Sequence, residues 1–445
     1  MRDTTTELGG RTGVVRIQRT QGDRVTSPCD ELIDRYRTVR RFSGTICETL
    51  VPEDYVIQTM PEMSPTKWHL AHTSWFFETF VLKVHLAEYE SLHPQYAFLF
   101  NSYYNAAGKM HARPQRGLIS RPTVKETWEY RQYVDGMMEK LLESADDEKL
   151  KVLTPLIILG LNHEQQHQEL MLTDIKHLFS MNPLRPAFRK QKSFDGKGAI
   201  ALEWRNFEGG IYSIGYDGTG FHFDNEGPRH EVLLKAFSLG TRLVTNREFM
   251  EFMNDDGYAR PEFWLSLGWN TINEKGWNAP FYWEQQDGKW MMMTLAGMRE
   301  VYLDEPVCHV SYFEADAYAR WAGARLPTEA EWEVASESAA MEGNFAESEF
   351  FHPVPAREAA QPEALSQMFG DVWQWTQSSY SPYPGYKPVT GALGEYNGKF
   401  MCNQYVLRGA SCATAKSHAR RTYRNFFPPD ARWQFMGIRL AKDVK

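Results

Sequence analysis

The sequence predicts a protein of two unlike parts, an N-terminal bundle of α-helices followed by an irregular α+β domain. The 445-residue chain is long enough for two or three domains. Apolar residues recur at helical spacing through residues 30–181, whereas residues 201–445 are rich in glycine and aromatic residues and break into short segments. We expect residues 1–29 to be a flexible arm. Residues 182–200, which are basic and contain proline and glycine, are expected to be a linker.

Three helices of the first part can be placed from their starts. The segment DELIDRYRTVRRFSGTIC, residues 30–47, has apolar residues near every 3.6 positions. Ser64 and Pro65 suit an N-cap and a first helical turn, so a second helix is expected there. Thr123 is followed three residues later by Glu126, and this capping-box spacing predicts the start of a third helix.

A fourth helix is expected from about Thr154 to Phe179, which completes an antiparallel bundle. Residues 87–122 form a long irregular connection, a length typical of functional or disordered loops. Three further capping-box spacings predict helix starts in the second part: Thr245 with Glu248, Ser311 with Glu314, and Thr328 with Glu331.

Composition excludes several classes of function. The formal net charge is -8 and the pI is about 6.0, which argues against a nucleic-acid surface as the main function. The sequence contains no run of 18 apolar residues, so no membrane span is predicted. The N-terminus lacks the apolar region of a secretory signal. The five cysteines form no CxxC pair, which suits a reducing cytoplasm. The oligomeric state is not determined by these features.

Two histidines interrupt the apolar stripe of the fourth helix. In LGLNHEQQHQELMLTD, residues 159–174, His163 and His167 lie four positions apart. At 100° per residue both point with the leucines into the bundle. Because burying two imidazoles is costly without partners, we expect a shared metal ion. A pair of core histidines held by hydrogen bonds is the alternative.

The third ligand is expected from the second helix. His72 shares a face with Trp68 and Trp75, so it is the better inward candidate. His69 lies at the edge of that face, where a hydrogen-bonded or partly solvated histidine is expected. Three neutral imidazoles on a divalent ion leave coordination positions open for other molecules.

The pattern HEQQH also matches the H-E-x-x-H of zinc peptidases. The extended form of that motif needs a third histidine where this chain has Thr173, with no glycine between. The form with two histidines and one glutamate is not excluded by spacing. We favour the other site, because His72 lies on a separate helix and fits a three-histidine arrangement.

Six segments, in this order, resemble the sulfoxide synthases of ergothioneine biosynthesis (EgtB type) across residues 30–443. The order of all six across both parts of the chain is specific, although no single segment is. They are SPTKWHLAHTSWFFETF, NSYYN, NHEQQHQELMLTD, RLPTEAEWEVA, GDVWQWTQSSY and RNFFPPDARWQFMGIRLA.

The resemblance implies a DinB-like four-helix bundle and a domain like formylglycine-generating enzymes, which is related to C-type lectins. It implies a mononuclear non-haem Fe(II) held by His72, His163 and His167. The implied reaction uses O₂ to join a cysteine-type sulfur donor to N-α-trimethylhistidine (hercynine), giving a hercynyl sulfoxide. Its partners are thus small molecules, with no nucleic acid and no membrane.

The resemblance also implies residues that bind hercynine. Gln166 matches the family's glutamine that helps to position hercynine, and Asn425 matches an asparagine near the trimethylammonium group. Phe426 and Phe427 are candidates for cation–π contact with that group, or for packing between the domains. In relatives that use γ-glutamylcysteine this asparagine precedes Trp-Asp, and the acid holds the dipeptide. Here that acid is absent.

Relatives that use free cysteine place an adjacent tyrosine pair from the bundle loop in the site, which corresponds to Tyr103 and Tyr104. We therefore expect cysteine as the donor, with γ-glutamylcysteine as the alternative. Tyr104 is the expected proton or hydrogen donor and Tyr103 its relay, with Tyr380 as a rival donor. Arg113 and Arg116 could bind the carboxylate of cysteine, or be solvated loop charges.

Other functions stay open. A zinc-dependent DinB-like thiol transferase and a non-catalytic lectin-like binding protein share parts of this pattern. Formylglycine-generating activity is not expected, because only Cys412 lies in the late RGAS region where that family has a cysteine pair. Ovothiol-type synthases usually append a methyltransferase, which residues up to Lys445 do not contain. Trp373 and Trp375 are expected to be structural.

Overall fold

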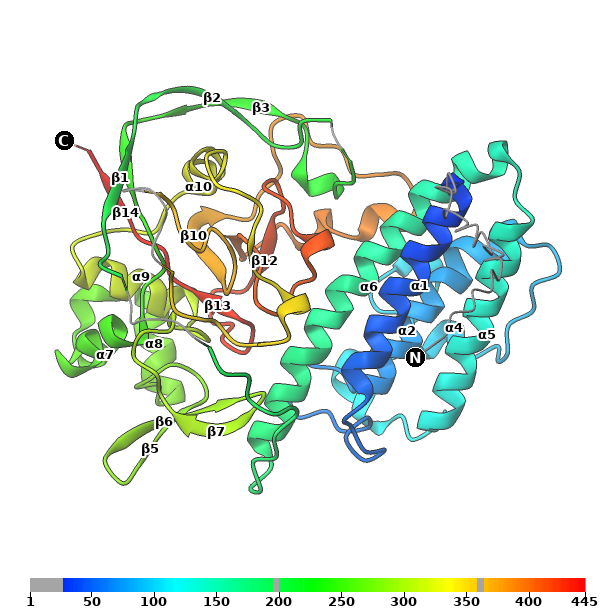
Figure 1. The fold of residues 1–445 in the computed structure, drawn as a ribbon, viewed down its shortest axis with the longest axis horizontal. Coiled ribbons are helices and arrows are strands. Elements are labelled where there is room, and N and C mark those ends of the chain that lie inside the picture. Colours follow the sequence, from blue (N-terminus) through cyan, green and yellow to red (C-terminus); the bar gives the residue numbers. More distant parts are fainter. Residues whose placement is uncertain (1–26, 195–199, 219, 358–363, 445) are drawn as a thin grey trace, which may run out of the picture.

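The computed structural model describes residues 27–194, 200–218, 220–357 and 364–444. Figure 1 shows a helical bundle, blue to cyan, beside a domain of short strands and helices, green to red. The predicted arm lies outside the described residues except for its last three. Residues 182–194 of the predicted linker contain no helix or strand, and residues 195–199 lie outside the described part.

Four long helices make up the bundle, and two of them begin with a complete capping box. Ser27 and Asp30 cap the first helix, and the predicted box of Thr123 and Glu126 is confirmed at the third. The four helices are α1 (Pro28–Cys47), α2 (Thr66–Phe77), α5 (Val124–Glu143) and α6 (Asp147–Met181).

Two predicted helix starts are wrong. Ser64 does not cap α2, because Pro65 is the N-cap residue and the Ser64 hydroxyl instead accepts a hydrogen bond from an arginine side chain. Helix α6 begins at Asp147, about two turns before the predicted start. The Asp146 side chain accepts from the Lys149 N–H at 2.8 Å, which caps the helix there, and Pro155 is accommodated inside it.

The long connection between α2 and α5 is ordered in short helical pieces. Helix α2 runs directly into a π-helix, a form often found at functional sites. The Trp68 Nε1–H of α2 donates to the Leu99 carbonyl at 3.0 Å and ties the connection to the bundle. The pieces are the π-helix η1 (Glu78–Leu82), α3 (Lys83–His85), α4 (Tyr96–Leu99), and the 3-10 helices η2 (Asn105–Ala107) and η3 (Arg113–Leu118).

The described residues of the second domain form five small sheets. Their strand orders are β1-β4-β14, β12-β11-β10-β13, β2-β3, β5-β6-β7 and β8-β9. The strands are β1 (Trp204–Phe207), β2 (Gly210–Ile214), β3 (His230–Leu234), β4 (Phe237–Gly240), β5 (Trp283–Gln286), β6 (Lys289–Thr294), β7 (Gly297–Glu300), β8 (Gly343–Asn344), β9 (Phe369–Gly370), β10 (Trp373–Ser379), β11 (Tyr405–Arg408), β12 (Asn425–Phe427), β13 (Met436–Gly437) and β14 (Ala441–Asp443).

Short helices cover these sheets. All three capping boxes predicted in this part are confirmed, at the starts of α7, α9 and α10. The helices are α7 (Asn246–Asn254), α8 (Ser266–Lys275), α9 (Tyr312–Trp321) and α10 (Glu329–Ser336), with 3-10 turns η4 (Asp224–Glu226), η5 (Gly257–Ala259), η6 (Pro261–Phe263), η7 (Ala346–Ser348), η8 (Ala392–Glu395), η9 (Gly398–Phe400) and η10 (Lys416–His418).

The four-stranded sheet brings predicted site residues to the boundary between the two parts. Strand β12 pairs antiparallel with β11, with Phe426 opposite Val406, and β11 pairs with β10. One apolar core cluster contains residues of both parts, from Leu32 of α1 to Leu440. The bundle and the second domain are therefore packed against each other through buried side chains, and α6 lies at that boundary (Figure 1).

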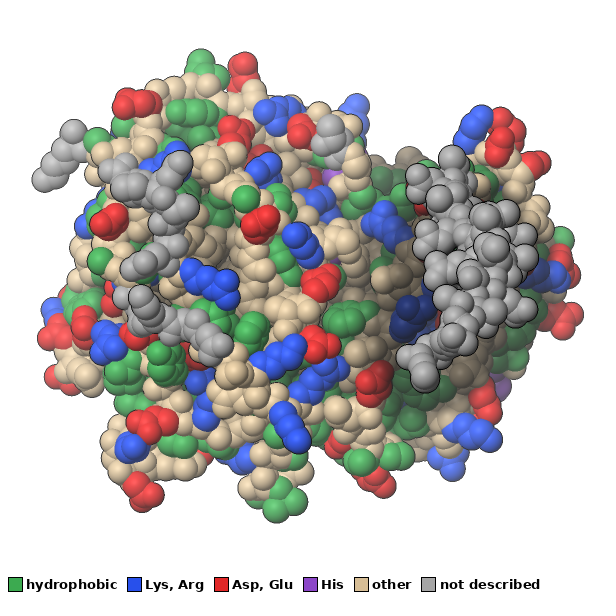
Figure 2. All heavy atoms as spheres, viewed as in Figure 1, with side chains coloured by type: hydrophobic (Ala, Val, Ile, Leu, Met, Phe, Trp, Pro, Cys, Tyr) green, Lys and Arg blue, Asp and Glu red, His purple; other side chains and the backbone are tan. Residues whose placement is uncertain are grey.

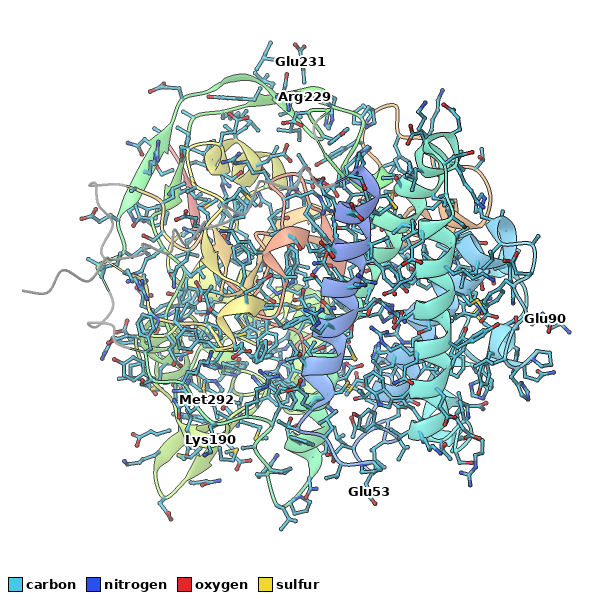
Figure 3. The ribbon with its side chains drawn as sticks, turned by 45° about the vertical axis from the view of Figure 1, so that its right-hand side comes forward. Glu53, Glu90, Lys190, Arg229, Glu231 and Met292 are labelled. Atoms are coloured by element: carbon cyan, nitrogen blue, oxygen red, sulfur yellow. The ribbon has the colours of Figure 1, made fainter. Side chains whose placement is uncertain are left out.

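The surface is mixed in charge. On the face shown in Figure 2, acidic and basic side chains are interspersed and form no continuous basic area. Figure 3 shows peripheral charged residues such as Glu53, Glu90 and Glu231 pointing outward. In the described part of the chain, no helix combines the length and the apolar character that a membrane span requires.

Candidate metal centre

Three buried histidines converge between α2 and α6. Each of His72, His163 and His167 offers a ring nitrogen, and these three atoms all lie within 4.8 Å of one another. The Nε2 atoms of His72 and His163 are 3.1 Å apart. The three rings meet edge to face, with centroids 4.6 to 4.9 Å apart. The three histidines that the helix projection selected therefore lie together.

The electrostatics of the triad favour the ligand form of imidazole. Burial, and then the neighbouring histidines, hold the pKa of His72 and of His167 well below the usual value. Burial lowers the pKa of His163 to about 3. The rings are therefore neutral, as a metal requires. Two nitrogens bound side by side at about 2.1 Å from one ion lie about 3.0 Å apart, so the 3.1 Å between the Nε2 atoms of His72 and His163 fits two ligands of one ion.

The outward ring nitrogens of His72 and His167 have hydrogen-bond partners, whereas His163 Nδ1 has none among the described residues. The Nδ1–H of His72 donates to the Phe100 carbonyl at 2.6 Å, which leaves Nε2 free as a ligand. His167 Nδ1 lies 2.8 Å from His69 Nδ1, and His69 Nε2 lies 2.9 Å from an Asp174 oxygen. His69 is buried and hydrogen-bonded at both nitrogens. Of the two environments expected for it, hydrogen-bonded or partly solvated, the first is observed.

This chain of hydrogen bonds determines which ring nitrogen of His167 is available to a metal. For a neutral His69 ring that donates its Nε2–H to the Asp174 carboxylate, Nδ1 is the acceptor of the Nδ1–H of His167. The lone pair of His167 Nε2 is then the one available to a metal. Such outer partners raise ligand basicity and hold the ring in place.

The His69→Leu variant is therefore expected to bind metal about 10- to 100-fold more weakly than the wild type. Anaerobic titration of the metal-free protein with Fe(II) measures this affinity. Asp174→Asn should give a smaller loss in the same direction, because His69 stays in place. Wild-type affinity in the His69→Leu variant would show that the contact has no influence on the metal.

The glutamate of the HEQQH pattern lies on another face of α6. Glu164 is fully buried, accepts from Ser43 Oγ at 2.6 Å and from Arg40 Nη1 at 2.9 Å, and also pairs with Arg131. Although burial alone raises its pKa, Arg131 and Arg40 lower the pKa of Glu164 to about 2. With both oxygens engaged by arginines, Glu164 is not placed to activate a metal-bound water as in H-E-x-x-H peptidases.

A cavity of about 410 Å³ adjoins the triad, with walls from α2, α6, the long bundle loop and the second domain. His163 and His167 line it directly. Every predicted substrate-binding residue lines it as well, together with one of the two tyrosines: Arg113, Arg116, Gln166, Asn425, Phe426, Phe427 and Tyr103.

The two arginines of the loop differ in their surroundings. Arg116 is only 3% exposed, lies 3.4 Å above the Trp68 ring and donates to Ser64 Oγ at 2.8 Å. Its Nε–H has no partner, and no described carboxylate forms an ion pair with it. Burial lowers the pKa of this guanidinium. The interpretation as a solvated charge is wrong for Arg116, whereas Arg113 is exposed.

The tyrosine pair is stacked, with ring centroids 4.7 Å apart. Tyr103 lines the cavity, and Tyr104 lies behind it against Trp75 and Phe80. The Tyr104 hydroxyl is buried without a hydrogen-bond partner among the described residues, and burial raises its pKa well above the usual value. The rival Tyr380 does not line the cavity. It lies beneath Phe426 with ring centroids 4.0 Å apart.

Two further tyrosines of the second domain reach the predicted hercynine residue. The Tyr396 hydroxyl donates to Gln166 Oε1, and Gln166 Nε2 donates to the Tyr423 hydroxyl at 2.5 Å. The Tyr396 ring also lies 5.8 Å from the His163 ring. Sequence reasoning missed both. Tyr423 stands two residues before Asn425 and could have been found, whereas Tyr396 lies in no recognisable motif.

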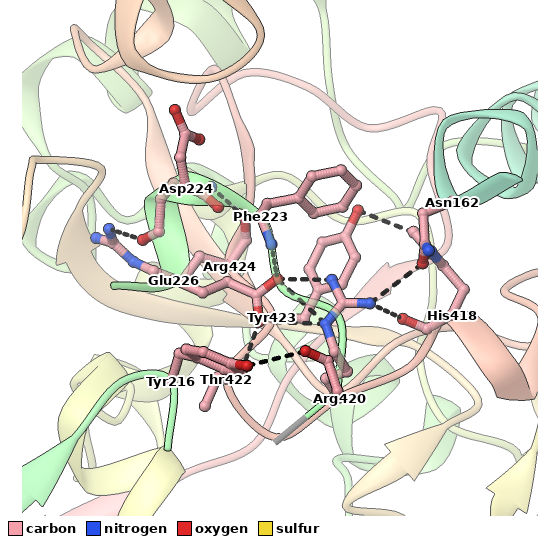
Figure 4. Close-up of polar contacts among 12 residues, drawn as sticks. Asn162, Tyr216, Phe223, Asp224, Glu226, His418, Arg420, Thr422, Tyr423 and Arg424 are labelled. Carbon is pink, nitrogen blue, oxygen red and sulfur yellow. Dashed lines mark hydrogen bonds and ion pairs between the residues drawn. The ribbon is translucent and has the colours of Figure 1, made fainter. Parts of the chain in front are cut away.

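A polar network supports Tyr423 from behind (Figure 4). Arg420 pairs with Glu226 at 2.6 Å and donates to the His418 carbonyl at 2.8 Å. His418 Nδ1 lies 2.9 Å from Asn162 Oδ1 on α6, and its Nε2 lies 3.2 Å from the Tyr423 hydroxyl. The segment before β12 is thus fixed to the helix that carries two of the histidines.

Glu169 is a third residue of the cavity wall that sequence reasoning missed. It accepts from Ser411 Oγ at 2.5 Å, from Thr414 Oγ1 at 2.6 Å and from Trp373 Nε1–H at 2.8 Å, and its burial raises its pKa. Trp373 therefore both joins the domains and lines the cavity. Trp375 donates to the Val310 carbonyl, in agreement with its expected structural role.

Comparison with known proteins agrees with this architecture. The family model of the sulfatase-modifying factor enzyme 1-like domain matches residues 202–364 and 353–444. A protein of Mycolicibacterium smegmatis named hercynine oxygenase is 33% identical over 412 residues, which cover 87% of this chain and 93% of the relative. A Mycobacterium tuberculosis protein of the same name is 32% identical and covers 86% and 92%.

A third relative is similar over a shorter stretch. Ergothioneine biosynthesis protein 1 of Schizosaccharomyces pombe is 26% identical over 236 residues, which cover 50% of this chain and 28% of the relative. Together with the helical N-terminal part, these matches confirm the fold class that the resemblance implied, a helical bundle followed by a formylglycine-generating-enzyme-like domain.

Proposed function

The chain belongs to the hercynine oxygenase (EgtB-type) family of ergothioneine biosynthesis, and we propose that it joins L-cysteine to hercynine in an Fe(II)- and O₂-dependent reaction that yields hercynylcysteine sulfoxide. The observation that carries the proposal is a buried triad of neutral imidazoles on a cavity walled by both domains. The reaction balances without another reductant. One hydrogen leaves carbon and one leaves sulfur, and O₂ supplies the sulfoxide oxygen and one water.

The residues proposed to hold the ion are His72, His163 and His167. Bound Fe(II) supplies the redox chemistry that O₂ activation needs, and three protein ligands leave positions for substrates. Zn²⁺ also suits imidazole ligands but has no redox chemistry. A zinc-dependent thiol transferase would therefore act without O₂, and this distinguishes it from the proposed synthase.

We propose Arg116 as the group that binds the α-carboxylate of cysteine. Its guanidinium is buried beside the cavity with no carboxylate partner among the described residues, and a desolvated guanidinium forms strong paired bonds with carboxylates. Arg113 lies on the same loop, is exposed, and donates to the Glu62 carbonyl. Arg113 is suited to attract the carboxylate of cysteine to the entrance of the cavity.

The preference for cysteine over γ-glutamylcysteine rests on the two residues after Asn425. The dipeptide carries one more carboxylate and places its amine farther from sulfur. Phe426 and Phe427 line the cavity where an acid would be needed to hold that amine. Two acids line the cavity. Glu169 already accepts three hydrogen bonds, and the exposed Glu62 lies on the bundle side, where its backbone carbonyl accepts from Arg113.

Replacing Arg116 by methionine is expected to raise the KM for cysteine about 10- to 100-fold, because the carboxylate loses a charged hydrogen bond. The KM for hercynine should change little. Steady-state kinetics with each substrate varied in turn measures both constants. Arg121→Met, on an exposed part of the same loop, is the matched control. An equal rise in both KM values would argue for a structural role instead.

Hercynine is proposed to lie between Gln166 and the β12 segment. Gln166 is held by Tyr396 and Tyr423, and Asn425 lines the same cavity. The faces of Phe426 and nearby aromatic residues suit a trimethylammonium group, which is attracted to aromatic rings.

The proton donor is proposed to come from the tyrosine pair. Since Tyr103 contacts the cavity and Tyr104 lies behind it, we now assign the donor role to Tyr103 and the supporting role to Tyr104. Burial raises the pKa of Tyr103 above its usual value, so the hydroxyl holds its proton at neutral pH.

A cytoplasmic location is also proposed, since all five cysteines are free thiols.

The direct test is product mass analysis after incubation with Fe(II), O₂, hercynine and either sulfur donor. The proposal expects hercynylcysteine sulfoxide from cysteine and little product from γ-glutamylcysteine. If only the dipeptide reacts, the donor assignment is wrong while the family activity stands.

A further inference from the structure

The side chain of Gln434 is a buried amide whose nitrogen has no hydrogen-bond partner in the described part of the chain. The residue is 2% exposed and lines the cavity next to Trp433, which also lines it. Its Nε2 makes no hydrogen bond within the described residues. The backbone carbonyl of Gln434 accepts from the Met436 N–H at 2.9 Å. The next residue, Phe435, is fully buried in the core. The backbone is therefore anchored, and the side-chain amide lies buried in the cavity wall.

A ligand is expected to form a hydrogen bond with an amide in this position. A buried polar group without a partner is costly, and native structures rarely keep one. The neighbouring amides are less available or less buried. Asn425 and Gln404 are only half-buried. The Gln166 Nε2 already donates to the Tyr423 hydroxyl. Gln434 is thus a buried donor whose bond a cavity ligand could complete.

The wall around Gln434 selects the kind of ligand. On the side of the second domain, the described lining residues include Tyr396, Tyr423, Phe426 and Trp433 and no lysine or arginine. A quaternary ammonium is attracted to such aromatic faces and is not repelled there. A carboxylate on the same molecule must then be met by neutral donors, because the arginines of the cavity lie on the bundle loop.

We propose that the Gln434 amide binds the carboxylate of hercynine and so makes the site specific for a betaine rather than a simple quaternary amine. This inference rests on the proposed function. It separates the two carboxylates of the reaction, that of cysteine at Arg116 on the bundle side and that of hercynine at Gln434 on the side of the second domain.

The test compares two ligands in two proteins. Hercynine and N,N,N-trimethylhistamine, which lacks only the carboxylate, are titrated calorimetrically into the full-length Fe(II)-loaded protein without oxygen. Gln434→Leu is expected to weaken hercynine binding about 10- to 100-fold, the range of a hydrogen bond to a charged group. Binding of trimethylhistamine should be the same in both proteins. Gln434→Glu should weaken hercynine further by repulsion and should not weaken trimethylhistamine.

Gln165→Leu is the matched control, because that amide lies on α6, outside this cavity, and donates to Ser417 Oγ at 2.6 Å. Equal weakening of both ligands by Gln434→Leu would indicate a packing role and overturn the proposal, as would unchanged hercynine affinity. These outcomes are distinct from failure of the proposed function, in which the wild type neither binds hercynine nor forms product from it.

Discussion

The His163→Ala variant is expected to lose iron binding and product formation. His163 supplies one of the three nitrogens of the triad from α6 and is 1% exposed, and alanine has no side-chain atom that could replace its ring nitrogen. Removing an outer-shell partner of a metal ligand already costs about 10- to 100-fold in affinity, so loss of a ligand itself should cost at least about 100-fold. Product formation should fall with the iron content.

Iron content after anaerobic reconstitution, measured together with product formation, tests this expectation. His93→Ala, an exposed histidine of the bundle loop, is the control and should behave as the wild type. A non-catalytic lectin-like binding protein predicts instead that His163→Ala keeps ligand affinity unchanged. That result, with full iron content, would contradict the assignment of His163 as a ligand.

The Glu164→Leu variant is expected to lower the free energy of unfolding by about 3–5 kcal/mol. The change leaves the buried guanidinium groups of Arg40 and Arg131 without their shared carboxylate. Both arginines are nearly inaccessible to solvent, so water cannot replace the lost partner. Because Arg40 belongs to α1 and Arg131 to α5, this carboxylate ties three bundle helices together at the level of His163.

Thermal and denaturant unfolding of the metal-free proteins measures the effect without a contribution from iron. The matched control is Glu139→Leu, which removes the partner of Arg37 in an exposed pair 2.7 Å apart. Exposed pairs contribute about 1 kcal/mol or less. Equal destabilisation by the two changes would mean that the Glu164 cluster does not hold the bundle together.

The features that could be predicted are those set by local pattern. Capping boxes such as Thr245 with Glu248 satisfy backbone donors within one turn, so sequence alone identifies them. The three histidines that lie together could be selected because inward-facing imidazoles at helical spacing are unusual. The start of α6 was misplaced because Pro155 is tolerated inside a helix that Asp146 caps earlier.

The features that could not be predicted depend on contacts between distant segments. Tyr396 reaches Gln166 across 230 residues, and its segment has no periodic pattern. The relative positions of Tyr103 and Tyr104 follow from how the loop packs on Trp75, which the sequence does not specify. Gln434 lies inside a recognised motif, yet its importance appears only once its amide is found buried without a partner.

The central claim is that three imidazoles from α2 and α6 hold one redox-active ion beside a cavity that accepts both amino acids. Oxygen consumption by protein loaded with Fe(II), loaded with Zn²⁺ or left metal-free tests it most directly. The account predicts uptake of one O₂ per sulfoxide formed, only with Fe(II) and only when cysteine and hercynine are both present. Turnover by the zinc-loaded protein without oxygen uptake would contradict it.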